Sequence, residues 1–200
     1  MSSETKLPES RRLPLRQPPY DEATRKTIEN TAFKGLSPLN LRLSMAHHPL
    51  LASRFQSIAH AVLFEAQVPL RPKEIAIMRT TARAGGEYPW GMHVAIYGAR
   101  CDLTPGMCDQ IATAPDADAL TGDGWTDEDR LMIRMADELH ANADVTDATW
   151  AALNAQFPQT QVVELVFACA VYRMASYYTN TTAVPLEIGQ AHFPEGHRRG

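Results

Sequence analysis

One stretch near the C-terminal end restricts the fold more than any other part of this 200-residue sequence. Residues 159–181 read QTQVVELVFACAVYRMASYYTNT, which favours one long helix that is apolar on almost every side. A helix of that kind is stable in water only when protein surrounds it. We therefore expect this helix to lie at the centre of a helical bundle or in an interface between subunits.

The remaining sequence also favours helices. Apolar residues recur at helical spacing along the chain, and no segment of useful length alternates with the period of a strand. Asp21 is a good N-cap for a short helix, and residues 126–129 come close to a capping box. Gly85 and Gly86 are typical of a helix end. The predicted fold class is all-α, a helical bundle.

We expect a single domain with two polar ends. Residues 1–19 are rich in Ser, Pro, Arg and Glu, which predicts a flexible N-terminal extension. Residues 20–187 are predicted to form one helical domain, and residues 188–200 a polar tail. A chain of 200 residues can bury a full core without disulfides or a structural metal.

Charge and hydrophobicity restrict the partners. The formal net charge is −4 and there is no long basic run, so nucleic acid is not an expected partner. No run of about 18 apolar residues appears, and the N-terminus lacks the apolar core of a signal peptide. We expect a cytoplasmic protein that acts on a small molecule and does not contact a membrane.

Glu74 and His93 form the strongest candidate for chemistry. Two helices are predicted over 72–84 and 88–100, joined by a tight glycine turn and therefore antiparallel. With a rise of about 1.5 Å per residue, both side chains lie at similar depths below that turn. A carboxylate beside an imidazole can fix its tautomer, raise its basicity and relay a proton. Alternatively, Glu74 favours the helix dipole and His93 has only a structural role.

Further candidates surround this pair. Glu87 is either a second acid/base group or an N-terminal helix charge, and Trp90 is either a substrate platform or a core residue. Tyr97, one turn beyond His93, could donate a hydrogen bond into a pocket. Arg173 lies in the apolar helix and needs a partner, which is either a substrate carboxylate or an acid such as Glu164. The predicted catalytic residues are His93, Glu74 and Glu87, and the predicted substrate-binding residues are Trp90, Tyr97, Arg173 and His60.

No metal site or cofactor is expected. The sequence contains no HxH or HExxH motif and no clustered acids that would support histidine ligands. Cys101, Cys108 and Cys169 form no CxxC and no metal-ligand spacing. Cys169 lies in an apolar run and is expected to pack as a small hydrophobic residue. Thiol chemistry at Cys101 or Cys108 is retained only as a minor alternative.

The segment PLRPKEIAIMRTTARAGGEYPWGMHVAIYGARCDLTPGM, residues 69–107, resembles the core motif of the carboxymuconolactone decarboxylase family. That superfamily also contains the alkyl hydroperoxidase D proteins. The resemblance extends over roughly residues 46–187 and implies an all-α bundle that assembles into dimers, trimers or hexamers. It also implies a site between helices, near a subunit interface.

The resemblance carries one clear departure. The thiol branch of the family has a Glu, then a CxxC, then a His four residues later. When His93 is aligned with that His, Glu74 falls on the Glu, but Gly86 and Pro89 stand where the cysteines would be. Without them, the family's peroxide cycle cannot run.

The departure leaves general acid/base chemistry, as the decarboxylase branch is thought to use. The resemblance implies decarboxylation of a small carboxylated lactone or unsaturated oxo-acid, with His93 delivering a proton, Glu74 orienting it, and Tyr97 or Arg173 holding the anion. The alternatives are a proton-relay isomerase of a dienoic acid from aromatic breakdown and a binding or assembly protein without catalysis. A homo-oligomer is expected in each case.

Overall fold

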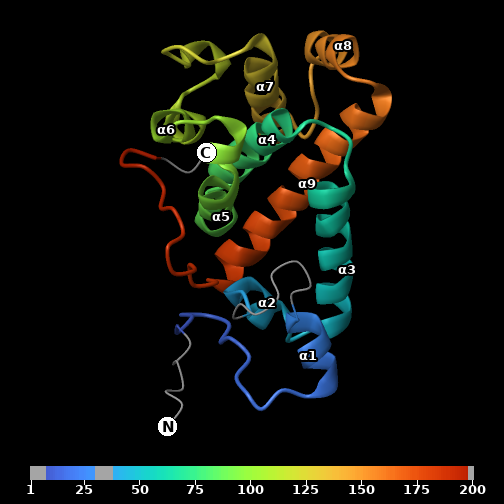
Figure 1. Ribbon diagram of the computed structural model, residues 1–200, viewed down its shortest axis with the longest axis vertical. Helices are drawn as coiled ribbons and strands as arrows, with labels where there is room; N and C mark the ends of the chain where they lie inside the picture. The colour runs from blue at the N-terminus through green and yellow to red at the C-terminus, as the bar shows by residue number, and fades with distance from the viewer. Residues whose placement is uncertain (1–7, 30–37, 198–200) are drawn as a thin grey trace.

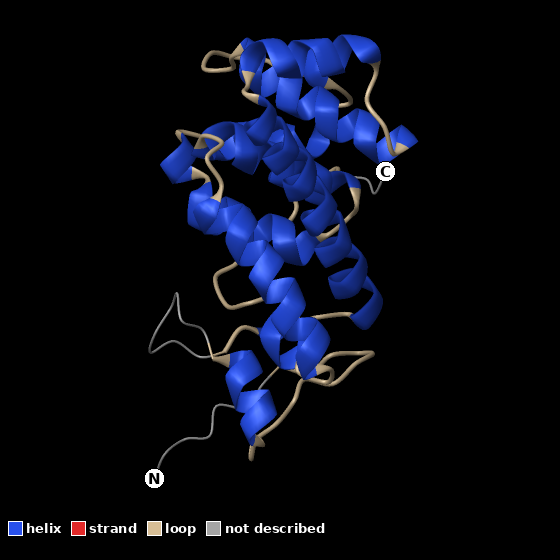
Figure 2. Cartoon of the chain, turned by 90° about the vertical axis from the view of Figure 1, so that its right-hand side faces the viewer, coloured by secondary structure: helices blue, strands red, loops and turns tan. Residues whose placement is uncertain are grey.

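The computed structural model describes residues 8–29 and 38–197, and within these ranges it contains helices and loops but no strand (Figures 1 and 2). The predicted all-α fold class is confirmed. The α-helices are α1 (Glu22–Ile28), α2 (Asn40–Met45), α3 (Pro49–His60), α4 (Leu70–Arg83), α5 (Glu87–Tyr97), α6 (Pro105–Thr113), α7 (Asp127–Asn142), α8 (Asp147–Gln156) and α9 (Gln159–Thr182). A π-helical turn (Ala61–Glu65) continues α3, and short 3₁₀ turns occur at Ala99–Cys101 and Ala117–Ala119.

Helix α4 forms the centre of the bundle. All its residues from 72 to 82 are buried, and it packs against α5, α6, α7 and α9. The main core lies around it and includes the fully buried side chains of Ile75, Met78, Ile111, Met132, Ile133 and Leu165. Because α4 contacts neighbours on every side, a polar side chain that it carries is held in a fixed position.

Helix α9 crosses the molecule diagonally beside α4 and α5 (Figure 1). Its inner face is buried, but its outer face is not. Phe167 is 50% exposed and Tyr177 is 59% exposed. Within the described part of one chain α9 buries only one face, so the predicted position at the centre of the bundle is wrong, while the alternative of a subunit interface stays a prediction. The large apolar side chains exposed along the outer face are Val163, Val166, Phe167, Met174 and Tyr177.

Local signals set the helix ends as the sequence indicates. The Asp21 carboxylate accepts a hydrogen bond from the Thr24 backbone N–H at 2.7 Å. Thr126 and Asp129 form both hydrogen bonds of a capping box at the start of α7. Gly85 has a φ of +61°, the left-handed conformation that favours glycine, and ends α4. The antiparallel pair α4 and α5 therefore forms around the predicted turn.

The described part of the N-terminal extension, residues 8–19, packs along the bundle. Leu15 is buried in a small cluster with Leu43. The Ser10 hydroxyl and the Leu13 backbone N–H donate hydrogen bonds to the Thr182 carbonyl at the end of α9. These contacts satisfy helix-end carbonyls that would otherwise depend on water. Residues 1–7 lie outside the described residues.

The C-terminal tail crosses the first turns of α5. Gln190 is buried, and its side-chain amide donates hydrogen bonds to the backbone carbonyls of Glu87 and Tyr88 at 3.1 and 2.6 Å. The Phe193 ring packs against Trp90, with ring centroids 4.9 Å apart. Residues 188–197 are therefore attached to the bundle, and residues 198–200 of the predicted tail are outside the described ranges. None of the described helices combines the length and hydrophobicity that a membrane crossing requires.

Candidate active site

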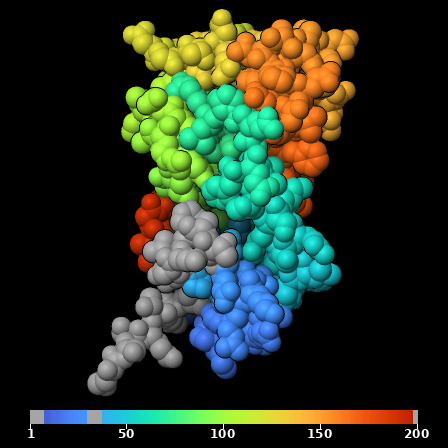
Figure 3. All heavy atoms as spheres, turned by 45° about the vertical axis from the view of Figure 1, so that its right-hand side comes forward, coloured from blue at the N-terminus to red at the C-terminus, as the bar shows by residue number. Residues whose placement is uncertain are grey.

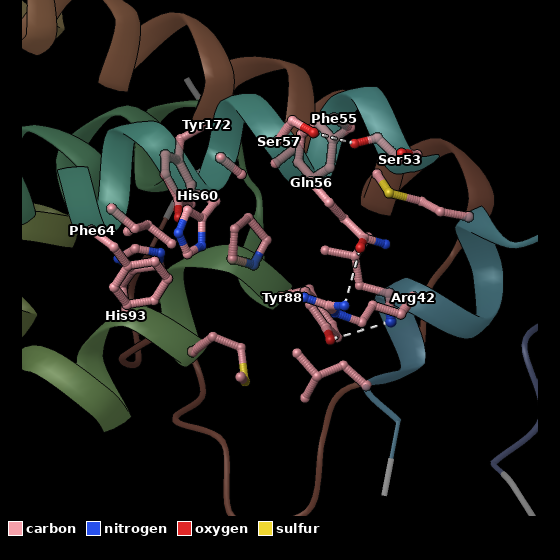
Figure 4. Close-up of a pocket in the computed structure, with 18 of the residues that line it drawn as sticks. Arg42, Ser53, Phe55, Gln56, Ser57, His60, Phe64, Tyr88, His93 and Tyr172 are labelled. Carbon is pink, nitrogen blue, oxygen red and sulfur yellow. Dashed lines mark hydrogen bonds between the residues drawn. The ribbon is translucent and has the colours of Figure 1, made fainter. Parts of the chain in front are cut away.

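A cavity of about 700 Å³ lies between α2, α3 with its π-helical turn, α5 and α9. Figure 3 shows one face of the molecule, on which α3 runs between the helices around α8 and the base formed by α1. Inside the cavity, His93, Tyr172, His60 and Phe64 gather at one end (Figure 4). Arg42, Gln56 and Tyr88 line the other end.

The buried acid and imidazole meet at the wall of this cavity. His93 Nδ1 lies 2.5 Å from Glu74 Oε2. Glu74 is 0% exposed and His93 is 5% exposed. Helix α4 supplies the carboxylate and α5 the imidazole, so the glycine turn between them brings the two together. A carboxylate at Nδ1 favours the proton there and leaves Nε2 as the basic nitrogen.

Two tyrosines flank the His93 ring. Its centroid is 5.3 Å from the ring of Tyr97 and 4.5 Å from that of Tyr172, which it meets edge-on. Burial raises the pKa of Tyr97, with a further contribution from the Glu74 charge. The same two causes raise the pKa of Tyr172 well above its ordinary value. Both hydroxyls therefore remain protonated at neutral pH and can donate hydrogen bonds.

Of the predicted substrate-binding residues, Tyr97 and His60 line the cavity. His60 is exposed, its Nε2 lies 3.6 Å from a Glu65 carboxylate oxygen, and its ring contacts Phe64. This histidine can therefore contact a ligand at the mouth of the cavity. It takes no part in the buried pair formed by His93 and Glu74.

The other predicted residues lie outside the cavity lining, and they are Trp90, Glu87 and Arg173. Trp90 is 1% exposed in the main core, where Phe193 covers it. The Glu87 carboxylate accepts a hydrogen bond from the Phe193 backbone N–H and lies 3.2 Å from His192 Nδ1. Trp90 and Glu87 are not brought together with His93, because the C-terminal tail covers their side of α5.

Arg173 also points elsewhere. It donates a hydrogen bond to the Tyr177 hydroxyl at 2.9 Å and contacts His140 of α7. One residue corresponds to about 100° of helix rotation, so the neighbour of the cavity-lining Tyr172 faces another direction. Its suggested partner Glu164 instead accepts hydrogen bonds from the backbone N–H groups of Gln67 and Val68.

Several residues that line the cavity are not among the site residues predicted from the sequence. Arg42, Gln56 and Tyr88 line the end opposite His93, and they come from α2, α3 and α5. The available signal was an arginine between two leucines, Leu41 and Leu43, in a short helix. That signal marks a partly buried charge, but it does not indicate which distant elements surround it.

Gly86, which aligns with the first cysteine of the CxxC, has no room for a larger side chain. A Cβ atom added there would lie 2.3 Å from the Ser176 hydroxyl oxygen, which α9 holds in place through a hydrogen bond to Tyr172. Pro89 lines the cavity. The backbone around the CxxC position has therefore packed too closely against α9 to accept a thiol without a shift.

The three cysteines of the chain are buried, and none forms a disulfide. Burial raises the pKa of Cys101 to about 12, and that of Cys108 and Cys169 to about 11. A thiol with such a pKa holds very little thiolate at neutral pH. Among residues 8–29 and 38–197, no group of three or more His, Cys, Asp or Glu side chains is placed to hold a metal ion.

No protein-family model and no curated protein sequence matches the chain. Solved structures do match it. A crystal structure described as an alkylhydroperoxidase AhpD core, an uncharacterized peroxidase-related protein from Ralstonia eutropha, superposes with a TM-score of 0.75 at 20% sequence identity. The match covers 91% of this chain and 94% of that protein. This chain has the alkylhydroperoxidase D fold.

Two further structures agree with this fold. An uncharacterized peroxidase-related protein from Silicibacter sp. matches 95% of this chain and 99% of its own, with a TM-score of 0.72 and 17% identity. A protein of unknown function from Agrobacterium tumefaciens matches 72% of this chain and 94% of its own, with a TM-score of 0.62 and 13% identity. At these identities the likeness concerns the alkylhydroperoxidase D fold alone.

Proposed function

We propose that this protein is a cofactor-independent general acid/base enzyme that acts on a small carboxylated lactone or unsaturated oxo-acid. Decarboxylation is the leading reaction. The observation that carries the proposal is the buried contact between Glu74 and His93 Nδ1 at the wall of a cavity. The closed CxxC position at Gly86 and the buried cysteines argue against a thiol peroxidase.

The proposed roles follow from the geometry. Loss of CO2 breaks a carbon–carbon bond and leaves its electron pair on the substrate as an enolate-like anion. The hydroxyls of Tyr97 and Tyr172 can donate hydrogen bonds to that anion. His93 in its protonated form then delivers a proton from Nε2 to carbon, and Glu74 stabilises the imidazolium before transfer. Uptake of one proton from solvent then restores the imidazolium, so each turnover consumes one proton and releases one CO2.

The same residues support an isomerase of a dienoic acid as the second candidate. In that reaction neutral His93 removes a proton from one carbon and returns it to another, so no carbon–carbon bond breaks and no CO2 is lost. Glu74 again holds the ring and balances its transient charge. A family member that binds a ligand without turnover is the third candidate. Deuterium uptake separates it from both enzymes.

The decisive experiment uses heavy water. Wild-type protein is incubated in D2O with lactone carboxylates, oxo-acids and dienoic acids, and mass spectrometry follows CO2 loss, deuterium at carbon and isomer formation. We expect His93→Ala to lower the rate at least about 10²-fold, the usual contribution of a general acid/base. Glu74→Gln should lower it less, because it keeps a hydrogen-bonding partner for the ring.

The exposed His192 provides the matched control, because His192→Gln also removes an imidazole but leaves the cavity intact. We expect this variant to react at the wild-type rate. Turnover that is unchanged in His93→Ala would refute the proposed mechanism. Binding without deuterium uptake or CO2 loss would favour the third candidate.

We also propose that the functional form is a homo-oligomer, a dimer, trimer or hexamer. Support comes from the outer face of α9, where the side chains of Val163, Val166, Phe167 and Met174 are exposed at helical spacing. A second copy of this chain is the proposed occupant, because the stripe is uncharged and can meet an identical stripe without burying charge.

A further inference from the structure

The end of the cavity opposite His93 contains a cation. Arg42 lines this end, and Figure 4 shows it beside Tyr88 and Gln56, away from the group formed by His93, His60 and Phe64. The Arg42 side chain is reached from the cavity, while its backbone belongs to α2. The cavity therefore has an acid/base pair at one end and a guanidinium at the other.

Neutral acceptors hold the Arg42 guanidinium in place. Its Nη1 donates hydrogen bonds to the Glu29 backbone carbonyl at 2.6 Å and to Gln56 Oε1 at 3.0 Å. The Gln56 amide nitrogen in turn donates to the Thr27 carbonyl at 2.9 Å. These contacts use one of the three guanidinium nitrogens. They orient the group without neutralising it.

The charge of Arg42 lacks a counterion in the described chain. Among residues 8–29 and 38–197, no carboxylate lies within ion-pair distance of this guanidinium, whereas Arg71, Arg79 and Arg83 each have one. Burial lowers the pKa of Arg42, but a guanidinium remains charged at neutral pH. A partly buried cation without an anion is costly, so an anionic ligand at this point would be favoured.

The wall between the two ends is largely apolar. Its apolar side chains can pack along a hydrocarbon or ring system, and the lining also includes the charged residues Lys26, Glu29 and Glu65. The apolar residues that line the cavity include Leu41, Met45, Phe55, Leu63 and Met92.

We propose that Arg42 binds the carboxylate of the substrate, so that an apolar body spans the cavity and places the reactive carbon at His93. This inference rests on the proposed function and defines its substrate class as an amphipathic acid whose carboxylate is remote from the reacting carbon. The carboxylate that Arg42 holds is not the group that reacts, so in a decarboxylation the substrate carries a second carboxylate, which is lost as CO2 at the His93 end. Arg42 thus takes the anion-binding role that the sequence suggested for Arg173.

The test compares acids with their neutral amides. Straight-chain 2-enoates of six to ten carbons and the corresponding primary amides are titrated into the full chain by calorimetry. For at least one length, we expect the wild type to bind the acid about tenfold more tightly than the amide, as a hydrogen-bonded charge pair would give. Arg42→Gln should abolish this preference while amide affinity changes less than twofold.

Three further variants make the result specific. Arg42→Lys should keep part of the preference, because it keeps the charge but loses the planar fork. Gln56→Glu should abolish the preference with Arg42 still present, because it supplies an internal carboxylate beside the guanidinium. Arg54→Gln removes an exposed arginine outside the cavity and should behave as wild type. Circular dichroism establishes that each variant is folded.

The outcomes separate this inference from the proposed function. An acid preference that survives in Arg42→Gln, or a wild type without preference at any length, overturns the role of Arg42. Acid binding that depends on Arg42, with no turnover of any substrate, supports this site but removes the proposed enzyme. Turnover that depends on His93, without an acid preference, supports the proposed enzyme but removes the role of Arg42.

Discussion

Arg79 is completely buried, and several contacts satisfy its guanidinium. Its Nε and Nη2 donate hydrogen bonds to the Asp137 carboxylate of α7 at 2.6 and 2.8 Å. It also donates to the backbone carbonyls of Ile111 and Ala114 at 2.8 and 2.9 Å. Because α4 carries both Arg79 and Glu74, this network fixes the helix that presents the carboxylate proposed to act in catalysis.

Asp137→Asn tests this network. We expect it to lower the free energy of unfolding by about 3–5 kcal/mol, because it leaves a buried guanidinium without its counterion. Burial raises the pKa of Asp137, but hydrogen bonds and charge from Arg79 and Arg83 outweigh it, so the pKa is lowered below 3.8. The wild-type contribution is therefore present above about pH 3.8 and is lost as pH falls through the folded-state pKa.

Urea denaturation between pH 2 and pH 7 measures this effect. The difference between wild type and Asp137→Asn should shrink toward low pH. Asp118→Asn is the control, because Asp118 is exposed and its closest approach to Arg134 is 3.7 Å; its effect should stay within about 0.5 kcal/mol. A difference for Asp137→Asn that is constant with pH would contradict the lowered pKa.

Individual site residues could be predicted from the sequence only where they lie on helices that are consecutive in the chain. Glu74 and His93 lie on consecutive helices with one short turn, so the helical rise fixes their relative depth. Trp90 and Arg173 were proposed for the substrate site because the sequence shows which helix carries them, but not which neighbour each faces. Arg42 was missed because its place in the cavity depends on the packing of α2, α3 and α5.

At the scale of elements, α5 and the C-terminal tail act as one unit. The tail runs so close to α5 that a Cβ atom at Gly91 would lie 2.0 Å from the Ala191 carbonyl oxygen. Glu187, directly before this tail, has a carboxylate that accepts hydrogen bonds from the Tyr88 hydroxyl and the Asn40 backbone N–H. Glu187 thus joins α5 to α2 at the rim of the cavity.

Gly91→Ala should displace the tail. We expect an overpacking cost of about 1–3 kcal/mol, faster amide hydrogen exchange over residues 187–193, and altered Trp90 fluorescence as Phe193 moves away. Gly106→Ala is the matched control, because a Cβ atom at Gly106 meets nothing closer than 4.0 Å and alanine favours helix α6. Wild-type exchange over residues 187–193 in Gly91→Ala would show that the tail is not held there.

Helices were easier to predict than the segments that join them. N-caps, the capping box and the glycine turn are local signals, and each appears where the sequence indicates. Residues 8–19 and 188–197 read as polar ends because their few apolar residues, such as Leu15 and Phe193, have no periodic spacing. Their binding to the bundle depends on surfaces that exist only after α5 and α9 are in place.

At the scale of the whole molecule, the outer face of α9 exposes a row of large apolar side chains. Phe167→Glu places a charge in the middle of the exposed stripe without touching the buried face of α9. We expect light scattering after gel filtration to show that the wild type is an oligomer and that this variant has at most half its mass, because an unpaired charge is costly in an interface.

Thr113→Glu adds the same charge at an exposed position of α6 and should leave the mass unchanged. A monomeric wild type would remove the proposed interface, as would an oligomer whose mass is the same in Phe167→Glu. Thermal unfolding of both variants distinguishes loss of assembly from loss of fold.

The position of Glu187 also has a consequence for biosynthesis. Ribosomes release the chain from its N-terminus onward, so Glu187 and Gln190 emerge after every residue of α1 to α9. Until then, Tyr88 and Asn40 lack the carboxylate that they share in the finished structure. The contacts that join α5 to α2 at the rim of the cavity therefore form only after α9 has been synthesised.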